Sequence, residues 1–254
     1  MISLKERLDA VLAEKGLFPS RERAKAAVMA GLVYVDGNRV DKPGTPVARS
    51  SEFSVKEGAC PYVSRGGLKL EKAIREYGIN LAGADCMDIG ASTGGFTDCL
   101  LKNGARIVYA VDVGYGQLDW KIRNDARVVN MEKTNIRYLD TDSMDMRFDF
   151  ICVDVSFISL KLVIPVAVRL LKSSGRLVCL VKPQFEAGRK QVGKKGVVRD
   201  EEVHREVIRK VIGYGLENGV YSHGVIPSPI TGAKGNVEFL IIFNMTENKS
   251  NDEE

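Results

Sequence analysis

The segment that most constrains the fold is Asp85–Phe96, a short apolar run that ends in an acidic residue and passes into a glycine-rich turn. A parallel strand that leads through such a turn into a helix is typical of the ligand-binding edge of an α/β sheet. Gly90, Gly94 and Gly95 leave the main chain open to a ligand, because no Cβ stands in the way. The segment therefore predicts a cofactor site at the end of a strand.

The spacing of the glycines narrows the choice of ligand. It is Asp-x-Gly-x-x-x-Gly-Gly, which differs from both the Gly-x-Gly-x-x-Gly turn of dinucleotide-binding proteins and the P-loop. Asp88 would repel a pyrophosphate at the strand end but attract the cationic end of S-adenosylmethionine. A tight turn that binds nothing is the alternative for this motif. Among enzymes the alternative is a dehydrogenase, which the spacing disfavours.

Length and composition bound the class of protein. A chain of 254 residues with 44% hydrophobic and 28% charged residues is typical of a soluble protein with one large and one small domain. No run approaches the roughly 18 apolar residues of a membrane span, and Lys5, Glu6 and Arg7 interrupt any signal peptide. We therefore expect a cytoplasmic protein without a membrane partner, and a monomer.

Cysteine, histidine and charge patterns add three expectations. The five cysteines form no Cys-x-x-Cys pair and there are only two histidines, so we expect reduced thiols and no metal site. The formal net charge is +4, but the acidic segment Glu247–Glu254 contributes −3, which leaves +7 on the rest of the chain. Such a balance suits an anionic partner.

Residues 1–59 are predicted to form a small α+β domain. Leu4, Leu8 and Val11 recur at helical spacing, and Ser20 can cap a second helix. Leu32–Val40 then reads as a strand, an Asp-Gly turn and a return strand. A linker at 60–63, a second domain at 64–245 and an acidic tail at 246–254 complete the expected organisation.

Basic residues lie along the second predicted helix at Arg21, Arg23 and Lys25. A solvated helix face is the simplest explanation for them. However, Arg-Leu-Asp followed by Ser-Arg-x-x-Ala-x-x-x-Val-x-x-Gly-x-Val-x-Val-x-Gly-x-x-Val resembles the RNA-binding module of ribosomal small-subunit protein four, over Ser3–Val55. The resemblance implies that these three side chains face RNA phosphates.

Residues 64–245 alternate between strand-like and helical runs, which predicts a doubly wound parallel sheet of the α/β class. The strand-like runs are Cys86–Ile89, Ile107–Val111, Val128–Asn130, Phe148–Val153, Leu177–Val181, Gly219–Ile226 and Val237–Asn244. The helical runs are Ser64–Tyr77, Phe96–Leu101, Leu118–Ile122, Leu160–Leu171 and Glu202–Tyr214. Because no helix separates the last two strands, the last strand should run antiparallel.

Charged residues follow the predicted strands at the edge where such sheets bind ligands. Asp112 ends the second strand, where an acid can bind ribose hydroxyls, and Asp154 and Lys182 end the fourth and fifth. A charge next to a buried strand is costly unless it is paired or functional. Glu238 would reach the same edge at the start of the antiparallel strand. Lys69 could join it from the predicted helix that enters the domain. For each residue alone, a strand-end charge facing solvent is the alternative.

Five segments carry a more specific pattern: Ser64–Leu70, Asp88–Phe96, Val111–Leu118, Asp154–Ile158 and Val181–Glu186. In this order they resemble the TlyA, or haemolysin-A-like, rRNA methyltransferases, and with the N-terminal module the resemblance covers nearly the whole chain. It implies a Rossmann-like, FtsJ-type methyltransferase domain that uses S-adenosylmethionine. The activity it implies is 2′-O-methylation of cytidine in ribosomal RNA, with ribosomal subunits as partners.

The resemblance also assigns roles to residues. It implies a Lys-Asp-Lys-Glu tetrad that falls on Lys69, Asp154, Lys182 and Glu238, with Lys182 as the candidate base. The candidate cofactor residues are Asp88, Gly90, Ser92, Thr93, Gly94, Gly95, Phe96, Asp112, Glu132 and Asp154. The candidate RNA-binding residues are Arg21, Arg23, Lys25, Arg65, Lys190, Lys194 and Lys195. The last three lie in a basic segment before Arg199 that suits phosphates, although a solvated flexible loop is the alternative.

Two functions from other classes are also compatible with parts of this pattern. A non-catalytic RNA-binding or ribosome assembly factor could retain the fold, but the intact tetrad and glycine turn disfavour it. A membrane-active haemolysin is suggested by the older family name, but no apolar span or strongly amphipathic anchor supports it.

Overall fold

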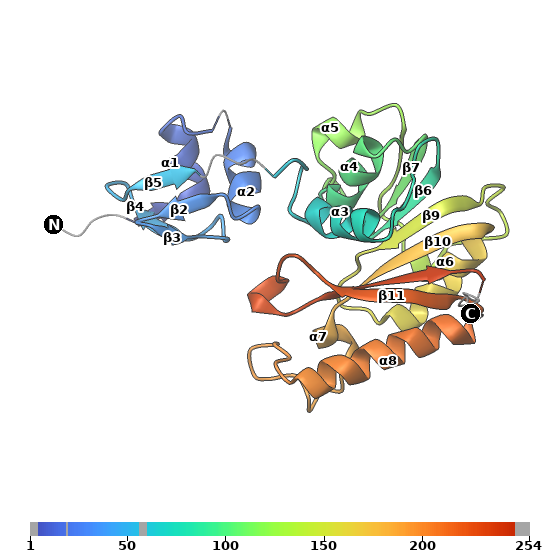
Figure 1. Cartoon of the computed structure of the whole chain (residues 1–254). Helices are drawn as coiled ribbons and strands as arrows, with labels where there is room; N and C mark the ends of the chain where they lie inside the picture. The colour runs from blue at the N-terminus through green and yellow to red at the C-terminus, as the bar shows by residue number, and fades with distance from the viewer. Residues whose placement is uncertain (1–4, 19, 56–59, 247–254) are drawn as a thin grey trace. The chain divides into compact units, whose positions relative to one another are not determined.

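The computed structural model describes residues 5–18, 20–55 and 60–246, so Ser3 and most of the acidic tail lie outside the described residues. The chain forms two compact units, residues 1–66 and residues 67–254 (Figure 1). None of the helices in the described ranges combines the length and the apolar character needed to cross a bilayer.

The N-terminal unit is a small α+β domain. Its elements are β1 (Lys5–Arg7), α1 (Leu8–Glu14), α2 (Arg21–Met29), β2 (Val33–Val35), β3 (Asn38–Arg39), β4 (Pro46–Ala48) and β5 (Phe53–Val55). The Ser20 side chain accepts a hydrogen bond from the Arg23 amide and so caps α2, as expected. Asp36 and Gly37 both have positive φ, which matches the twist of the β2–β3 hairpin.

The start of the first helix differs from the prediction. Leu4 lies outside the described residues, but Lys5–Arg7, which were expected in the same helix, pair with Pro46–Ala48 as a short antiparallel strand, and α1 begins only at Leu8. Leu8 and Leu12 are nevertheless fully buried in the core of this unit, together with Val28 of α2. Helical spacing therefore identified the buried face of the helix but not its first residue. The helix starts later because Lys5–Arg7 pair with β4 instead.

The C-terminal unit holds one large sheet and its helices. Its strands are β6 (Asp85–Ile89), β7 (Ile107–Val111), β8 (Val128–Met131), β9 (Phe148–Val153), β10 (Leu171–Val181), β11 (Tyr221–Pro227) and β12 (Phe239–Asn244). Its helices are α3 (Gly66–Glu76), α4 (Gly95–Lys102), α5 (Trp120–Arg123), α6 (Ile164–Leu170), α7 (Pro183–Glu186) and α8 (Glu201–Glu217). Short 3₁₀ turns lie at Ile136–Tyr138, Leu160–Leu162 and Ala233–Gly235.

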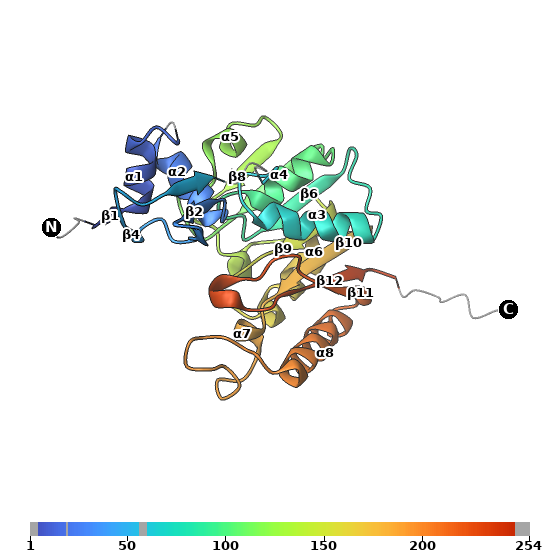
Figure 2. The same ribbon diagram turned by 60° about the vertical axis from the view of Figure 1, so that its left-hand side comes forward.

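The strands follow the order β11-β12-β10-β9-β6-β7-β8. Strands β10, β9, β6, β7 and β8 are parallel neighbours, and β12 runs antiparallel to both β10 and β11 (Figure 2). The predicted doubly wound sheet with an antiparallel last strand is confirmed. The order reverses at β6, so the crevice beside β6 is where such a sheet binds its ligand.

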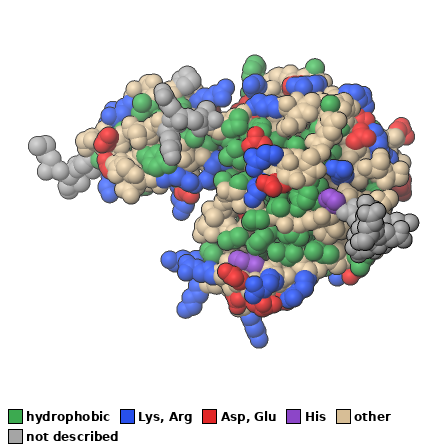
Figure 3. All heavy atoms as spheres, viewed as in Figure 1, with side chains coloured by type: hydrophobic (Ala, Val, Ile, Leu, Met, Phe, Trp, Pro, Cys, Tyr) green, Lys and Arg blue, Asp and Glu red, His purple; other side chains and the backbone are tan. Residues whose placement is uncertain are grey.

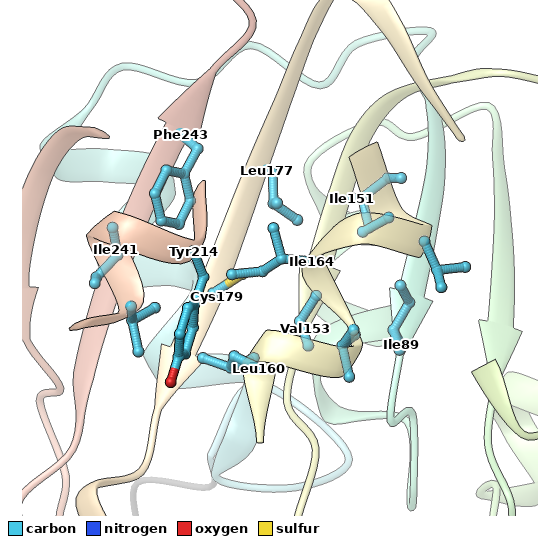
Figure 4. Packing of buried hydrophobic residues seen from close by; sticks show 14 of the residues in the cluster. Ile89, Ile151, Val153, Leu160, Ile164, Leu177, Cys179, Tyr214, Ile241 and Phe243 are labelled. Atoms are coloured by element: carbon cyan, nitrogen blue, oxygen red, sulfur yellow. The ribbon is translucent and has the colours of Figure 1, made fainter. Parts of the chain in front are cut away.

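Apolar side chains fill the space between the sheet and the helices α6 and α8. Figure 4 shows Ile151, Leu177 and Phe243 from the strands close to Ile164 of α6 and Tyr214 of α8. β6 is buried along its whole length, including its two aspartates, Asp85 and Asp88.

The helix predicted at Leu160–Leu171 is interrupted. A 3₁₀ turn at Leu160–Leu162 precedes α6, and Pro165 stands in the first turn of α6, where its missing amide costs no hydrogen bond. Leu171 already belongs to β10, which is longer than predicted and is irregular between Leu171 and Arg176. The proline was a signal for a new helix start within the predicted run.

Candidate active site

An ion pair joins the ends of the two central strands β9 and β10. Asp154 follows β9 and Lys182 follows β10, and Lys182 Nζ lies 2.5 Å from Asp154 Oδ1. Lys182 Nζ also donates a hydrogen bond of 2.9 Å to Ser156 Oγ. The two charged side chains are 11% and 19% exposed, so the lysine is held by two neighbours and is still accessible from the edge of the sheet.

A second ion pair lies at the same edge. Lys69 Nζ on α3 donates to Glu238 Oε2 at 2.6 Å, and both side chains are buried. Val181 pairs with Phe239 in the antiparallel register of β10 and β12, so Lys182 and Glu238 flank neighbouring strand ends. The four residues of the predicted tetrad thus meet at one sheet edge as two ion pairs. Removing one partner of such a pair leaves a buried charge and costs about 3–5 kcal/mol.

A cavity of about 300 Å³ opens beside β6 at this edge. Its lining includes four predicted cofactor residues, Gly90, Ser92, Asp112 and Asp154. Asp112 is fixed by two main-chain amides: Oδ2 accepts from Ser92 N at 2.8 Å and Oδ1 accepts from Gly114 N at 2.7 Å. Each carboxylate oxygen retains a second lone pair, with which a ligand hydroxyl can bond.

The backbone of the cavity wall is strained. Gly90 has a φ of 90°, and a Cβ at this position would overlap the carbonyl oxygen of Asp154. Ser92 and Phe157 also have positive φ, at 48° and 64°, which costs about 1–3 kcal/mol per residue outside glycine. Such strain persists only where the surrounding structure enforces it, and both Ser92 and Phe157 line the cavity, as does Gly90.

The other predicted cofactor residues build the turn or lie beside the cavity. Gly94 is the left-handed cap of α4, and a Cβ there would come within 2.9 Å of Leu118 Cδ1. Gly95 opens α4 and Phe96 is a core residue, while the Thr93 carbonyl accepts a hydrogen bond from Asp119.

Glu132 lies close in sequence to the cavity but is engaged elsewhere. Its Oε1 pairs with Arg123 at 2.5 Å and accepts from the Gln117 amide at 3.2 Å. Those contacts connect the loop after β8 to the loop after β7, and among the described residues Glu132 does not line the cavity, whereas the nearby Thr134 and Asn135 do.

Asp88 lies beneath the glycine turn and is fully buried. Its Oδ2 accepts a hydrogen bond of 2.6 Å from Thr97 Oγ1, whereas Oδ1 has no hydrogen-bond partner among the described residues. Burial raises the pKa of Asp88 to about 7, although the bond from Thr97 acts in the opposite direction. The carboxyl group is therefore half protonated near neutral pH.

Asp88 is expected to make stability depend on pH. Because the pKa of Asp88 is raised in the folded state, its contribution to the free energy of unfolding is fully present below pH 4. This contribution is lost as the pH rises to about 7. Asp88→Asn keeps an acceptor for Thr97 and does not ionise. The free energy of unfolding of Asp88→Asn should therefore rise relative to that of the wild type over this range, by about 4 kcal/mol in total. Thermal unfolding of the ligand-free proteins at several pH values measures this difference. A difference that stays constant with pH would contradict the raised pKa.

The basic segment before α8 is exposed, and hydrogen bonds attach its C-terminal part to Asn236. Lys190, Lys194 and Lys195 are exposed, and Figure 3 shows basic side chains projecting from this part of the large unit. Asn236 holds the segment: its Nδ2 donates to Gly196 O at 3.0 Å and its Oδ1 accepts from Val198 N at 3.1 Å. The lysines therefore project from a supported loop.

In the N-terminal unit the candidate RNA-binding residues differ in their surroundings. Arg23 and Lys25 are exposed along α2. Arg21 pairs with the buried Asp9 at 3.3 Å, yet half of its side chain stays exposed. Arg65 is partly buried, and this burial, followed by the proximity of Arg39, lowers the pKa of its guanidinium.

Ser156 was not among the predicted residues, although it contacts Lys182 directly. A signal was present, because Ser156 stands two residues after Asp154 on a loop at the predicted ligand edge. Asn236 was also missed, and it stands two residues before Glu238. Its bonds reach across 40 residues of chain, which no local pattern encodes.

Comparison with known proteins identifies both units. The FtsJ-like methyltransferase family matches residues 62–245, and the S4 domain matches residues 6–53. YqxC of Bacillus subtilis is 53% identical over 242 residues, which cover 95% of this chain and 86% of that protein. The 16S/23S rRNA (cytidine-2′-O)-methyltransferase TlyA of Mycobacterium tuberculosis is 44% identical over 236 residues, which cover 92% of this chain and 88% of that protein.

A solved structure agrees over both units. It is named as a hemolysin from Streptococcus thermophilus, and it matches with a TM-score of 0.76 and 47% identity over 96% of this chain and 90% of that one. The resemblance found in the sequence is confirmed: the chain belongs to the FtsJ-like methyltransferase family, in the group of TlyA and hemolysin A, and carries an N-terminal S4 domain.

Proposed function

We propose that this protein transfers a methyl group from S-adenosylmethionine to the 2′-hydroxyl of a cytidine in ribosomal RNA. The observation that carries the proposal is the Lys182–Asp154 ion pair, with Ser156 bonded to Lys182, beside a cavity that Asp112, Asp154 and Ser156 line. The relative from M. tuberculosis is named for this reaction on 16S and 23S rRNA. An N-terminal S4 domain is consistent with an RNA substrate.

The residues around the cavity fit S-adenosylmethionine. Asp112 offers carboxylate lone pairs of the kind that bind ribose hydroxyls, and Asp154 offers a negative charge to a cationic ligand. Gly90 keeps the wall open, since any Cβ would collide with the main chain of Asp154. When bound, S-adenosylmethionine supplies a methyl group on a positively charged sulfur, which is already activated for transfer.

Lys182 is the proposed proton acceptor. A ribose hydroxyl is a weak nucleophile, so its proton must be taken up as the oxygen reacts. In its neutral form Lys182 Nζ accepts this proton, and Asp154 Oδ1 at 2.5 Å stabilises the ammonium that results. Ser156 Oγ accepts a hydrogen bond from Nζ at 2.9 Å and so orients it. Lys69 and Glu238 form an ion pair without net charge at the neighbouring strand end.

The basic segment before α8 is proposed to bind RNA phosphates. If Lys190, Lys194 and Lys195 each neutralise one phosphate, replacing all three by alanine should reduce the slope of log affinity against log salt by about two. Binding of an rRNA fragment at several salt concentrations measures this slope. The matched control replaces Lys102 and Arg106, which stand at the opposite sheet edge, and should leave the slope unchanged. An unchanged slope in the triple variant would contradict the contact.

The direct test of the function is methyl transfer to ribosomal subunits. Purified 30S and 50S subunits are incubated separately with the protein and methyl-labelled S-adenosylmethionine, and the label is then mapped on the rRNA. We expect label at one or a few cytidines. Absence of label from both subunits, with cofactor binding verified by calorimetry, would instead favour a non-catalytic RNA-binding factor.

A further inference from the structure

We propose that Glu186 is a positioning residue for methyl transfer, which clamps the loop after β9 to the turn after β10. The effect on catalysis rests on the proposed function, whereas the clamp itself is defined by the hydrogen bonds of Glu186 to Ser159 and Leu160. Glu186 ends α7, four residues after Lys182, while the loop that it holds carries Asp154 and Ser156. It therefore connects the two segments that meet at the proposed base.

Both carboxylate oxygens of Glu186 are used in this connection. Oε2 accepts a hydrogen bond from Ser159 Oγ and Oε1 accepts one from the Leu160 amide, each at 2.7 Å. The side chain is 5% exposed, and this burial raises the pKa of its carboxyl group. Lys210 on α8 donates to the Glu186 carbonyl at 3.1 Å, so the main chain of the clamp is also fixed.

The loop held by Glu186 is strained and leads directly into the site. Phe157 has a φ of 64° and is 91% exposed, so it gains little from burial that could offset this backbone conformation. One end of the loop is anchored where the Asp154 amide donates to Ile89 O at 2.9 Å. The other end is anchored at Ser159 and Leu160 by Glu186.

A second contact joins the same two segments. The rings of Phe157 and Phe185 lie 5.0 Å apart, so the loop also packs against α7. Without Glu186 the strained loop can relax, and Ser156 and Asp154 would shift relative to Lys182. Because a displacement of about 1 Å in a reacting group can cost about a hundredfold in rate, the clamp should act on the chemical step.

Two substitutions separate positioning from simple support of the fold. Glu186→Ala removes both acceptors and should lower kcat about a hundredfold. Glu186→Gln keeps an acceptor for the Leu160 amide and can donate to Ser159 Oγ, so it should retain kcat within about fivefold. The control is Asp149→Ala at the opposite end of β9, where Asp149 accepts from the Asp85 amide at 2.9 Å and from Lys172 at 2.8 Å. It should lower the melting temperature without lowering kcat.

Amide hydrogen exchange of residues 155–160 gives a readout that does not depend on activity. Exchange in this loop should accelerate in Glu186→Ala but not in Glu186→Gln or Asp149→Ala. Normal kcat in Glu186→Ala, or a loss of kcat in Asp149→Ala of the same size, would overturn the positioning role. If the wild type methylates no RNA, the proposed function fails, while the exchange data still decide whether Glu186 holds the loop.

Discussion

Replacing Lys182 by alanine should lower the rate of methyl transfer by about 10² to 10⁴, the usual contribution of a positioned general base. Lys182 contacts Asp154 and Ser156 but, among the described residues, does not line the cavity. The affinity for S-adenosylmethionine should therefore stay within a few-fold of that of the wild type. Single-turnover transfer to rRNA and calorimetric titration of the cofactor measure the two effects separately.

The same strand offers a matched control for this experiment. Lys172 stands near the start of β10 and pairs with Asp149 at 2.8 Å and Asp85 at 3.4 Å, at the edge opposite Lys182. Lys172→Ala breaks a comparable ion pair and should leave the rate of transfer unchanged. Normal turnover in Lys182→Ala, with thermal unfolding showing an intact protein, would remove Lys182 from the mechanism.

Replacing Asp112 by alanine should weaken binding of S-adenosylmethionine by about 10- to 100-fold, the usual effect of losing hydrogen bonds to a charged group. The carboxylate lines the cavity and is held by the amides of Ser92 and Gly114, so its position does not depend on the ligand. Calorimetric titration of the purified variant measures the change.

Asp119 provides the control for Asp112, because it makes the same local contact outside the cavity. Its Oδ1 accepts from the Lys121 amide, two residues on, just as Asp112 accepts from Gly114. Asp119→Ala should bind S-adenosylmethionine like the wild type. Equal affinities of the Asp112 variant and the wild type would show that the acceptors for the ligand lie elsewhere.

Much of the site could be predicted because the carboxyl ends of parallel strands meet at one edge. Asp112, Asp154 and Lys182 each directly follow an apolar run, and their positions needed only the order of the strands. Glu238 required one more step, the antiparallel direction of β12, which the missing helix before it indicated. Local sequence thus defined which residues approach the cavity.

The pairing of those residues could not be predicted, since it depends on contacts between distant segments. Lys69 and Glu238 are 169 positions apart and still form their own ion pair, separate from Lys182 and Asp154. Glu132 shows the opposite case: its position in the sequence predicts a ligand contact, but Arg123 engages its carboxylate in this structure, and the ligand contact stays a prediction. Glu186 stands in the motif Val181–Glu186, but its contacts could not be predicted, because its partners belong to the loop after another strand.

The most direct test of the central claim is the chemical identity of the methylated nucleoside. Ribosomal RNA labelled by the wild-type protein is digested to nucleosides, and the label is separated by chromatography with mass spectrometry. A ribose methyltransferase that uses Lys182 as its base predicts label in 2′-O-methylcytidine, and at most about a hundredth as much after the same incubation with Lys182→Ala. Label in a base-methylated nucleoside, or equal labelling by the variant, would contradict the account.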